Sequence, residues 1–268
     1  MRFRRLHRWN LSLPEARRLQ ERLAARVSEA RPPGCAPRLV AGADMSHRRG
    51  SAWLYGAVVL VRLPDFQVLE TATARVRAVF PYVPGFLSFR EGPVLLKALA
   101  RLRRRPDAVL FDAHGRAHPR RFGLACHLGL WLGRPSVGCA KSRLCGEHDE
   151  PGPERGDRTA LREAGQVLAT VLRTRAGSRP VYVSIGHRVS LAAAEELVLR
   201  CGDGKHRLPE PIRLAHLAVN QLRRERDGEG EGREGGEGRE GREGREESEG
   251  KRPVGEAPWP TDHGLSVR

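Results

Sequence analysis

Residues 106–129, PDAVLFDAHGRAHPRRFGLACHLG, indicate the fold class of this chain. The run DAVLFD at 107–112 is short and apolar and ends in a carboxylate, which predicts a buried strand. A loop rich in histidine, arginine and glycine follows, and residues 123–132 then have the character of a buried helix. Because a strand, a loop and a helix form the repeating unit of α/β proteins, we expect a sheet that is at least partly parallel.

The segments on either side extend this pattern to a mixed sheet. Three strand-like runs separated by short polar connections come first, and such connections favour antiparallel neighbours. Strands and helices then alternate, so we expect an α/β protein with helices on both faces of the sheet, as in the ribonuclease H-like fold. The expected strands are residues 38–44, 52–62, 66–76, 107–112, 136–140 and 181–185, and the expected helices are 13–27, 91–104, 123–132, a segment near 160–173, and 191–200.

The charge of the chain is concentrated in its first part. The 268 residues have a net charge of +16, but residues 1–222 alone carry 38 Lys and Arg against 19 Asp and Glu. Residues 224–250 are almost entirely Glu, Gly and Arg, a composition that predicts disorder. We therefore expect a catalytic domain at 1–222 and a low-complexity tail at 223–268. A globular body with a net charge of +19 favours a polyanionic partner such as nucleic acid.

Several classes of protein are disfavoured by the composition. No apolar run approaches the roughly 20 residues that span a bilayer, and the basic N-terminus lacks the apolar stretch of a secretion signal. The cysteines are odd in number and show no metal-binding spacing, so we expect reduced thiols. The sequence therefore predicts a cytoplasmic protein that has no membrane partner and is a monomer. The cysteines are Cys35, Cys126, Cys139, Cys145 and Cys201.

Three acidic residues lie at expected element ends in apolar surroundings. Asp44 closes the first expected strand, Asp112 closes the fourth, and Glu91 opens a helix. Ligands collect at the carboxyl ends of strands in such sheets, and carboxylates brought together there can share a hard cation such as Mg²⁺. Taken singly, each could be a turn acid or a helix cap. Together, in a basic protein, they indicate metal-assisted phosphodiester chemistry.

Polar and mostly cationic residues follow three successive expected strands. The first group is the loop 112–123, the second is Lys141, and the third is the segment SIGHR at 184–188. Loops of this composition can bind phosphate or move protons, although they also occur on ordinary surfaces.

The turn FPYVPG, residues 80–85, holds Tyr82 between two prolines that restrict the backbone. A tyrosine held in this way near the acidic residues is a candidate for stacking on a displaced base, although a buried turn aromatic is the alternative.

Together these segments resemble the endonuclease V family, metal-dependent nucleases that act on deaminated purines in nucleic acid. The most specific segments are PYVPG at 81–85 and DAHGRAHPRRFG at 112–123, with AGAD upstream at 41–44. The matching segments fall in order along most of residues 9–217. They are residues 40–47, 80–93, 106–129, 135–141, 184–191 and 207–216.

The resemblance implies a ribonuclease H-like fold in which three carboxylates hold Mg²⁺, or alternatively Mn²⁺. It implies catalytic positions for the three metal-binding residues and for two residues near the scissile phosphate. It also implies a wedge tyrosine, a pocket for hypoxanthine formed by a Pro- and Gly-rich turn, and a supporting histidine. The metal positions are Asp44, Glu91 and Asp112, the positions near the scissile phosphate are Lys141 and His118, and the substrate-binding positions are Tyr82, Pro81, Pro84, Gly85, Gly115 and His216.

Four residues depart from the family's usual pattern. Ala113 stands where glycine usually follows the metal-binding aspartate, and Ile185 where proline often precedes the GHR segment. Met45 and His47 replace the more usual apolar and aromatic residues. These departures affect fine geometry but remove no implied metal ligand.

The resemblance implies a DNA repair endonuclease that nicks the second phosphodiester bond 3′ of hypoxanthine and leaves 3′-hydroxyl and 5′-phosphate ends. The absence of an insertion after residue 141 looks more like bacterial members and favours DNA. One alternative is cleavage of inosine-containing RNA. Another is a basic nucleic-acid-binding protein without catalysis, although carboxylates beside a phosphate would repel it.

Overall fold

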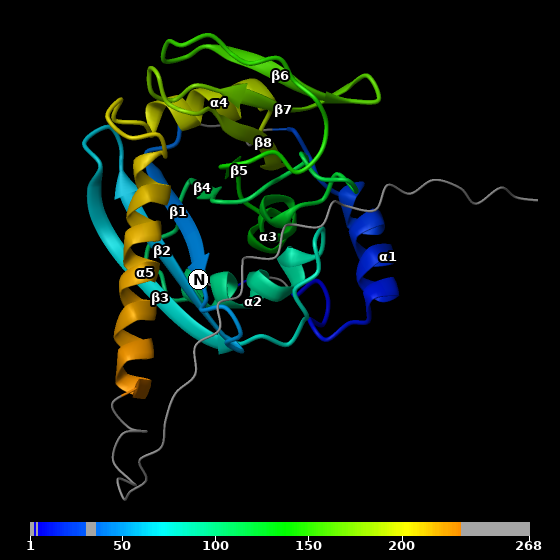
Figure 1. Ribbon diagram of the computed structural model, residues 1–268, viewed down its shortest axis with the longest axis vertical. Coiled ribbons are helices and arrows are strands. Elements are labelled where there is room, and N and C mark those ends of the chain that lie inside the picture. The colour runs from blue at the N-terminus through cyan, green and yellow to red at the C-terminus, as the bar shows by residue number, and fades with distance from the viewer. Residues whose placement is uncertain (1–2, 4, 31–35, 232–268) are drawn as a thin grey trace, which may run out of the picture.

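The computed structural model describes residues 3, 5–30 and 36–231, and its centre is one mixed sheet of eight strands (Figure 1). The strands lie in the order β3-β2-β1-β4-β5-β8-β7-β6. Their bounds are β1 Leu39–Ser46, β2 Trp53–Arg62, β3 Gln67–Arg77, β4 Ala108–Phe111, β5 Ser136–Ala140, β6 Arg158–Glu163, β7 Gln166–Leu172 and β8 Val181–His187.

Helices cover both faces of the sheet, as the sequence predicts (Figure 1). Alternate residues of β1 enter different hydrophobic clusters because neighbouring side chains of a strand point to opposite faces. Val40 joins a cluster with residues of α4 and α5, whereas Ala41 and Ala43 join one with residues of α2 and α3. The helices are α1 Leu13–Ala24, α2 Leu87–Ala100, α3 Leu124–Leu132, α4 Leu191–Arg200 and α5 Glu210–Glu231.

The directions of the strands confirm the expected mixed sheet. The first three strands form an antiparallel meander, and β4 and β5 then add in parallel to β1. The carboxyl ends of β1, β4 and β5 therefore meet at one edge, and this edge is where the sequence predicts the functional residues.

The expected helix near residues 160–173 is wrong, because these residues form the hairpin of β6 and β7. Its two-residue turn is Ala164-Gly165, and both residues have positive φ, 49° and 77°. Two positive φ values match the twist of a tight hairpin and end any helix at this point. Strand-favouring residues such as Val167 and Val171 flank the turn.

The strand β8 is antiparallel to β5, so its polar end does not join those of β4 and β5. His187 lies opposite Ser136, at the start of β5, and its Nδ1 accepts a hydrogen bond of 3.2 Å from the Ser28 backbone. The prediction that polar and mostly cationic residues follow this strand is wrong for residues 184–187, which lie within β8, and His187 instead holds the chain that follows α1.

The last helix, α5, has no counterpart among the predicted elements. It runs past residue 222 to Glu231, so the prediction of disorder is wrong for residues 224–231. Glu and Arg favour helices, and this stretch also bonds to the sheet: Arg223 Nε donates to Ser46 Oγ at 3.0 Å, and the Tyr55 hydroxyl donates to Asp227 at 3.2 Å. Residues 232–268 lie outside the described residues, and the domain boundary at 222 stays a prediction.

Two further expectations concern membranes and cysteines. Across residues 3, 5–30 and 36–231, no helix has the length and apolar character needed to cross a membrane. Cys126, Cys139, Cys145 and Cys201 are free thiols, and Cys35 lies outside the described residues.

Candidate active site

Two aspartates lie side by side where the parallel strands β1 and β4 end. Ala43 pairs with Phe111, and the Asp112 amide donates to the Ala43 carbonyl at 3.1 Å, so Asp44 and Asp112 follow on the same face. Asp44 is 8% exposed. The sequence predicts Asp44 at the end of its strand. In the structure it lies two residues before the end of β1, because pairing with β2 continues to Ser46.

Each oxygen of Asp44 accepts one hydrogen bond. Oδ1 accepts from the Met45 backbone at 2.7 Å, and Oδ2 lies 2.7 Å from Nδ1 of His216 on α5. The remaining lone pairs of the carboxylate are available to a ligand.

Lys141 follows β5 directly, as predicted, and its Nζ forms an ion pair with Asp112. The side chain of Asp112 is nearly buried, whereas that of Lys141 is partly exposed. The lysine therefore supplies one positive charge at the inner edge of the site and keeps access to solvent.

Glu91 reaches the site from the other face of the sheet. It lies in the second turn of α2 rather than at the start, because Gly85, with φ 76°, ends the preceding turn and the helix begins at Leu87. Burial, together with the nearby charges of Asp44 and Asp112, raises the pKa of Glu91 to about 7. Burial and the charge of Asp112 also raise the pKa of Asp44.

These carboxylates fit a divalent cation. Asp44, Asp112 and His216 offer ligand atoms that lie within 4.8 Å of one another, and Glu91 is close enough for its charge to act on both aspartates. The negative charge of these buried carboxylates exceeds the single positive charge of Lys141, so a divalent cation would relieve their mutual repulsion. Oxygen donors of this kind are the ligands that Mg²⁺ and Mn²⁺ prefer.

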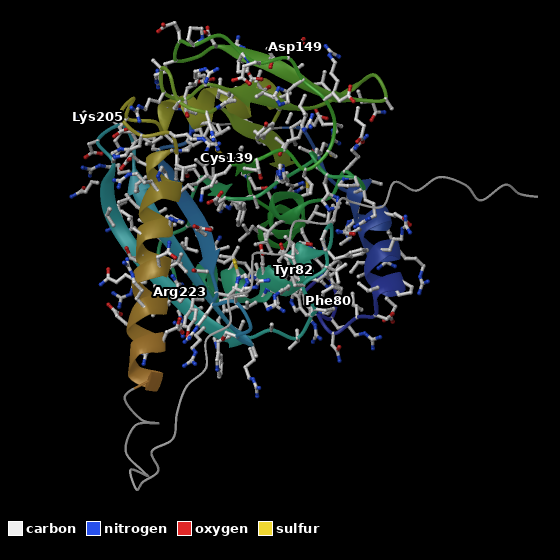
Figure 2. All side chains as sticks on the ribbon, viewed as in Figure 1. Phe80, Tyr82, Cys139, Asp149, Lys205 and Arg223 are labelled. Carbon is white, nitrogen blue, oxygen red and sulfur yellow. The ribbon has the colours of Figure 1, made fainter. Side chains whose placement is uncertain are left out.

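A cavity of about 450 Å³ adjoins the carboxylates. Glu91, Asp112 and Lys141 line it together with Tyr82, which is 61% exposed and lies just before α2 (Figure 2). A larger and more open hollow of about 930 Å³ lies along β6, but none of these residues lines it. The smaller cavity is therefore the candidate active site.

The turn that carries Tyr82 is fixed by hydrogen bonds to the carbonyl oxygen of Gly85. Three side chains donate to it: Gln20 at 3.0 Å, His118 at 3.0 Å and Arg120 at 2.6 Å. These donors come from α1 and from the loop 112–123, so both segments hold the turn in place. The roles of Gln20 and Arg120 cannot be predicted from the sequence, because nothing in a local pattern indicates which carbonyl they reach.

His118 lies in the wall of the cavity. Its Nδ1 accepts from the Arg120 backbone at 3.1 Å, so its Nε2 carries the proton that it donates to Gly85. Burial, and to a lesser extent the charge of Arg120, lowers the pKa of His118 to about 4. Both ring nitrogens are therefore occupied in supporting the turn.

The remaining predicted residues separate into those at the cavity and those behind it. Pro84 and Gly85 line the cavity, whereas Pro81 and Gly115 do not. Gly115 is instead required by packing, because a side chain there would overlap the backbone carbonyl of Ile185. His114, not predicted as a site residue, lines the cavity and has a buried Nδ1 without a hydrogen-bond partner.

The chain is similar to known proteins of one family. The family model of Endonuclease V matches residues 21–217. The Endonuclease V of Roseiflexus castenholzii is 49% identical over 217 residues, covering 81% of this chain and 96% of the relative. The crystal structure of the Streptomyces avermitilis Endonuclease V matches with a TM-score of 0.77 and 37% identity, covering 82% of this chain and 96% of that one.

A third match is a Ciona intestinalis Endonuclease V in complex with a 24mer DNA containing an inosine followed by a ribo-adenosine. It has a TM-score of 0.70 and 25% identity, and the match covers 80% of this chain and 98% of that one. The match to the family model spans most of the described chain, from α1 to the His216 segment. By fold, by sequence and by the carboxylates that it brings together, the chain belongs to the endonuclease V family of nucleases.

Proposed function

We propose that this protein is a DNA repair endonuclease that acts on hypoxanthine in DNA with Mg²⁺, or alternatively Mn²⁺, as its cofactor. It nicks the second phosphodiester bond 3′ of the deaminated base and leaves 3′-hydroxyl and 5′-phosphate ends. The observation that carries this proposal is the position of Asp44, Glu91 and Asp112 beside a cavity that Tyr82 also lines. The inosine-containing DNA of the Ciona complex supports the same class of substrate.

In this proposal the residues at the strand ends bind the cation and the phosphate. Asp44, Asp112 and Glu91 would hold the cation through carboxylate oxygens. When bound, it would polarise the phosphate and lower the pKa of water. Lys141 stays paired with Asp112 and offsets negative charge on the phosphate, and His216 donates to Asp44 and fixes its orientation.

The turn at residues 80–85 recognises the lesion. An enzyme that contacts a base inside a duplex rotates it out of the stack, and this costs a few kcal/mol. Tyr82 is exposed enough to occupy the gap in the stack, and the cavity of about 450 Å³ offers room for one purine. The donors on Gly85 keep the turn rigid, so Tyr82 loses little conformational freedom on binding.

An inosine-specific endoribonuclease is the second candidate function. The DNA in the Ciona complex has a ribo-adenosine directly after inosine. The ribose of that nucleotide lies beside the bonds that would be cut. A protein distinguishes RNA from DNA by contacts to the 2′-hydroxyl. The two candidates therefore differ in the sugar that the site near Lys141 accepts.

One nicking experiment tests both functions. The substrates are end-labelled duplex DNA with a single hypoxanthine, undamaged duplex, matched inosine RNA, and a hybrid strand with one ribonucleotide after inosine. Each is incubated with Mg²⁺ or with EDTA. We expect a metal-dependent cut one nucleotide beyond the lesion, and its loss in Asp44→Ala and Asp112→Ala while binding is retained. Tight binding without a cut on any substrate would support the non-catalytic alternative.

We also propose that the protein acts as a cytoplasmic monomer. The high positive charge of the body disfavours self-association. Light scattering after size-exclusion chromatography tests the oligomeric state, and fractionation of the source cells tests the compartment.

A further inference from the structure

A chain of polar side chains links Asp44 to Arg223 across the interface of β1 and α5. His216 Nδ1 lies 2.7 Å from Asp44, and its Nε2 lies 3.1 Å from the amide nitrogen of Asn220. The side-chain oxygen Oδ1 of Asn220 lies 3.0 Å from Ser46 Oγ, and Ser46 Oγ lies 3.0 Å from Arg223 Nε.

The spacing of these residues explains why they meet. His216, Asn220 and Arg223 are four and three residues apart, so they share one face of α5. Asp44 and Ser46 are two residues apart on β1 and point to the same side of the sheet. Arg223 lies on α5 (Figure 2), and its side chain contacts Ser46, the last residue of β1.

The chain has one direction, because a guanidinium can only donate hydrogen bonds. Ser46 Oγ accepts from Arg223 and turns its own hydrogen to the carbonyl oxygen of Asn220. The Asn220 amide group then faces His216, where it donates to the backbone carbonyl at 3.0 Å and to Nε2. His216 Nε2 therefore accepts, and a neutral imidazole keeps its proton on Nδ1, which faces Asp44.

Arg223 is itself held in place. Its guanidinium lies 3.6 Å from Asp227 one helical turn further on, and Asp227 accepts a hydrogen bond from the buried Tyr55 hydroxyl at 3.2 Å. The chain of hydrogen bonds thus begins at a group anchored to β2.

We propose that Asn220 and Arg223 are positioning residues that hold His216 as an Nδ1–H donor to Asp44. His216 then orients a metal-binding carboxylate and is not itself a metal ligand. In the opposite tautomer, the Nδ1 lone pair would face an Asp44 oxygen at 2.7 Å, and the repulsion would turn the carboxylate. Asn220 and Arg223 lie beyond residue 217, where the family match ends.

The first test reads the tautomer directly. The metal-free full chain is labelled with ¹⁵N-histidine, and the His216 signals are assigned by their loss in His216→Gln. We expect a protonated Nδ1 and an unprotonated Nε2. Asn220→Asp keeps the shape of the side chain but replaces the amide donor with a carboxylate oxygen. In this variant we expect Nε2 of His216 to carry a proton. A protonated Nε2 in the unsubstituted protein, or no change in Asn220→Asp, overturns the proposal.

The second test measures Mn²⁺ affinity by calorimetry and checks each variant by its thermal transition. Loss of a partner behind a metal ligand weakens metal binding about tenfold or more, so Asn220→Leu is expected to lose about tenfold. Arg223→Met acts through two further side chains and is expected to lose roughly threefold, with Arg223→Lys close to the unsubstituted protein. Arg224→Met is the matched control, because Arg224 is exposed and its Nε donates to the backbone carbonyl of Asn220 and not to the Asn220 side chain.

The outcomes separate this inference from the proposed function, on which it rests only for the role of Asp44 as a metal ligand. Neither measurement uses a substrate, so failure to nick inosine would leave the expected tautomer and affinities unchanged. If Asn220→Leu or Arg223→Met binds Mn²⁺ as Arg224→Met does, the positioning role of that residue is overturned, whatever the protein cleaves.

Discussion

Replacing Gly42 by alanine tests whether the seat of α5 on β1 sets the geometry of the active site. A Cβ built at Gly42 would lie 2.0 Å from the carbonyl carbon of Pro211, in the first turn of α5, and 2.4 Å from the Ile212 amide. These neighbours are backbone atoms, which cannot move aside by changing a rotamer. Helix α5 must therefore shift by about 1.4 Å to reach an ordinary contact of 3.4 Å.

We expect two consequences of this shift. Overpacking costs about 1–3 kcal/mol, and a conflict with backbone atoms should cost about 3 kcal/mol, which lowers the Tm by roughly 6–12 °C in a domain of this size. A displacement of this size is also enough to break the 2.7 Å hydrogen bond between His216 and Asp44, because α5 carries one partner and β1 the other. Nicking by the folded variant should therefore fall together with its stability.

Calorimetry and the nicking assay, both carried out well below the Tm, measure the two effects. The matched control is Gly56→Ala on β2, whose Cβ would lie 3.1 Å from Val94 Cγ2 and 3.2 Å from the Val94 carbonyl oxygen, so that a shift of only a few tenths of an ångström relieves the contact. We expect a loss below about 1 kcal/mol there and little change in nicking. If Gly42→Ala melts within 2 °C of the control, or unfolds earlier but keeps full activity, the reasoning about α5 is refuted.

Three other predictions concern charge, recognition and pH. Asp112→Asn keeps the shape of the side chain but removes a charge, so nicking with Mg²⁺ should fall at least a hundredfold, and higher Mn²⁺ should restore part of it; unchanged turnover would contradict a metal role. Tyr82→Ala should weaken cleavage of a hypoxanthine duplex roughly tenfold, by the 1–3 kcal/mol of a lost stacking contact, while Tyr82→Phe should stay near the unsubstituted rate. Burial lowers the pKa of His127 well below its usual value, and that of His187 to about 4. Because each histidine takes up a proton more readily in the unfolded chain, these two groups should lower stability as the pH drops from about 6.5 towards 4; the stability of the unsubstituted protein and that of His127→Gln, measured by urea unfolding, should differ in slope by about 1.4 kcal/mol per pH unit in this range.

The parts of the fold that follow local patterns could be predicted from the sequence. Apolar runs such as residues 136–140 and 191–200 have the bounds that the structure gives them, because burial and period fix both the type and the length of the element. The hairpin at Ala164-Gly165 was missed because Leu161, Leu168 and Leu172 fit helical spacing nearly as well as a strand. The deciding signal was the conformation of two turn residues.

The candidate site was predictable to a different degree for each residue. Asp44 and Asp112 could be placed together because parallel strands bring their ends to one edge. Glu91 was found as a carboxylate near a turn, but its approach from α2 depends on how that helix packs. The pairing of His216 with Asp44 could not be predicted, since it depends on a long-range interface between β1 and α5, and the helix itself was not predicted.

The contact between Asp44 and His216 also bears on how the nuclease is made in the cell. The two residues are 172 positions apart, so the first strand leaves the ribosome long before the helix that completes its face. At typical rates of synthesis this interval is roughly 10–30 s. During that time the growing chain has its carboxylates but lacks the histidine that orients one of them. A chain still attached to the ribosome, close to messenger RNA, is thus an incomplete nuclease until its last helix forms.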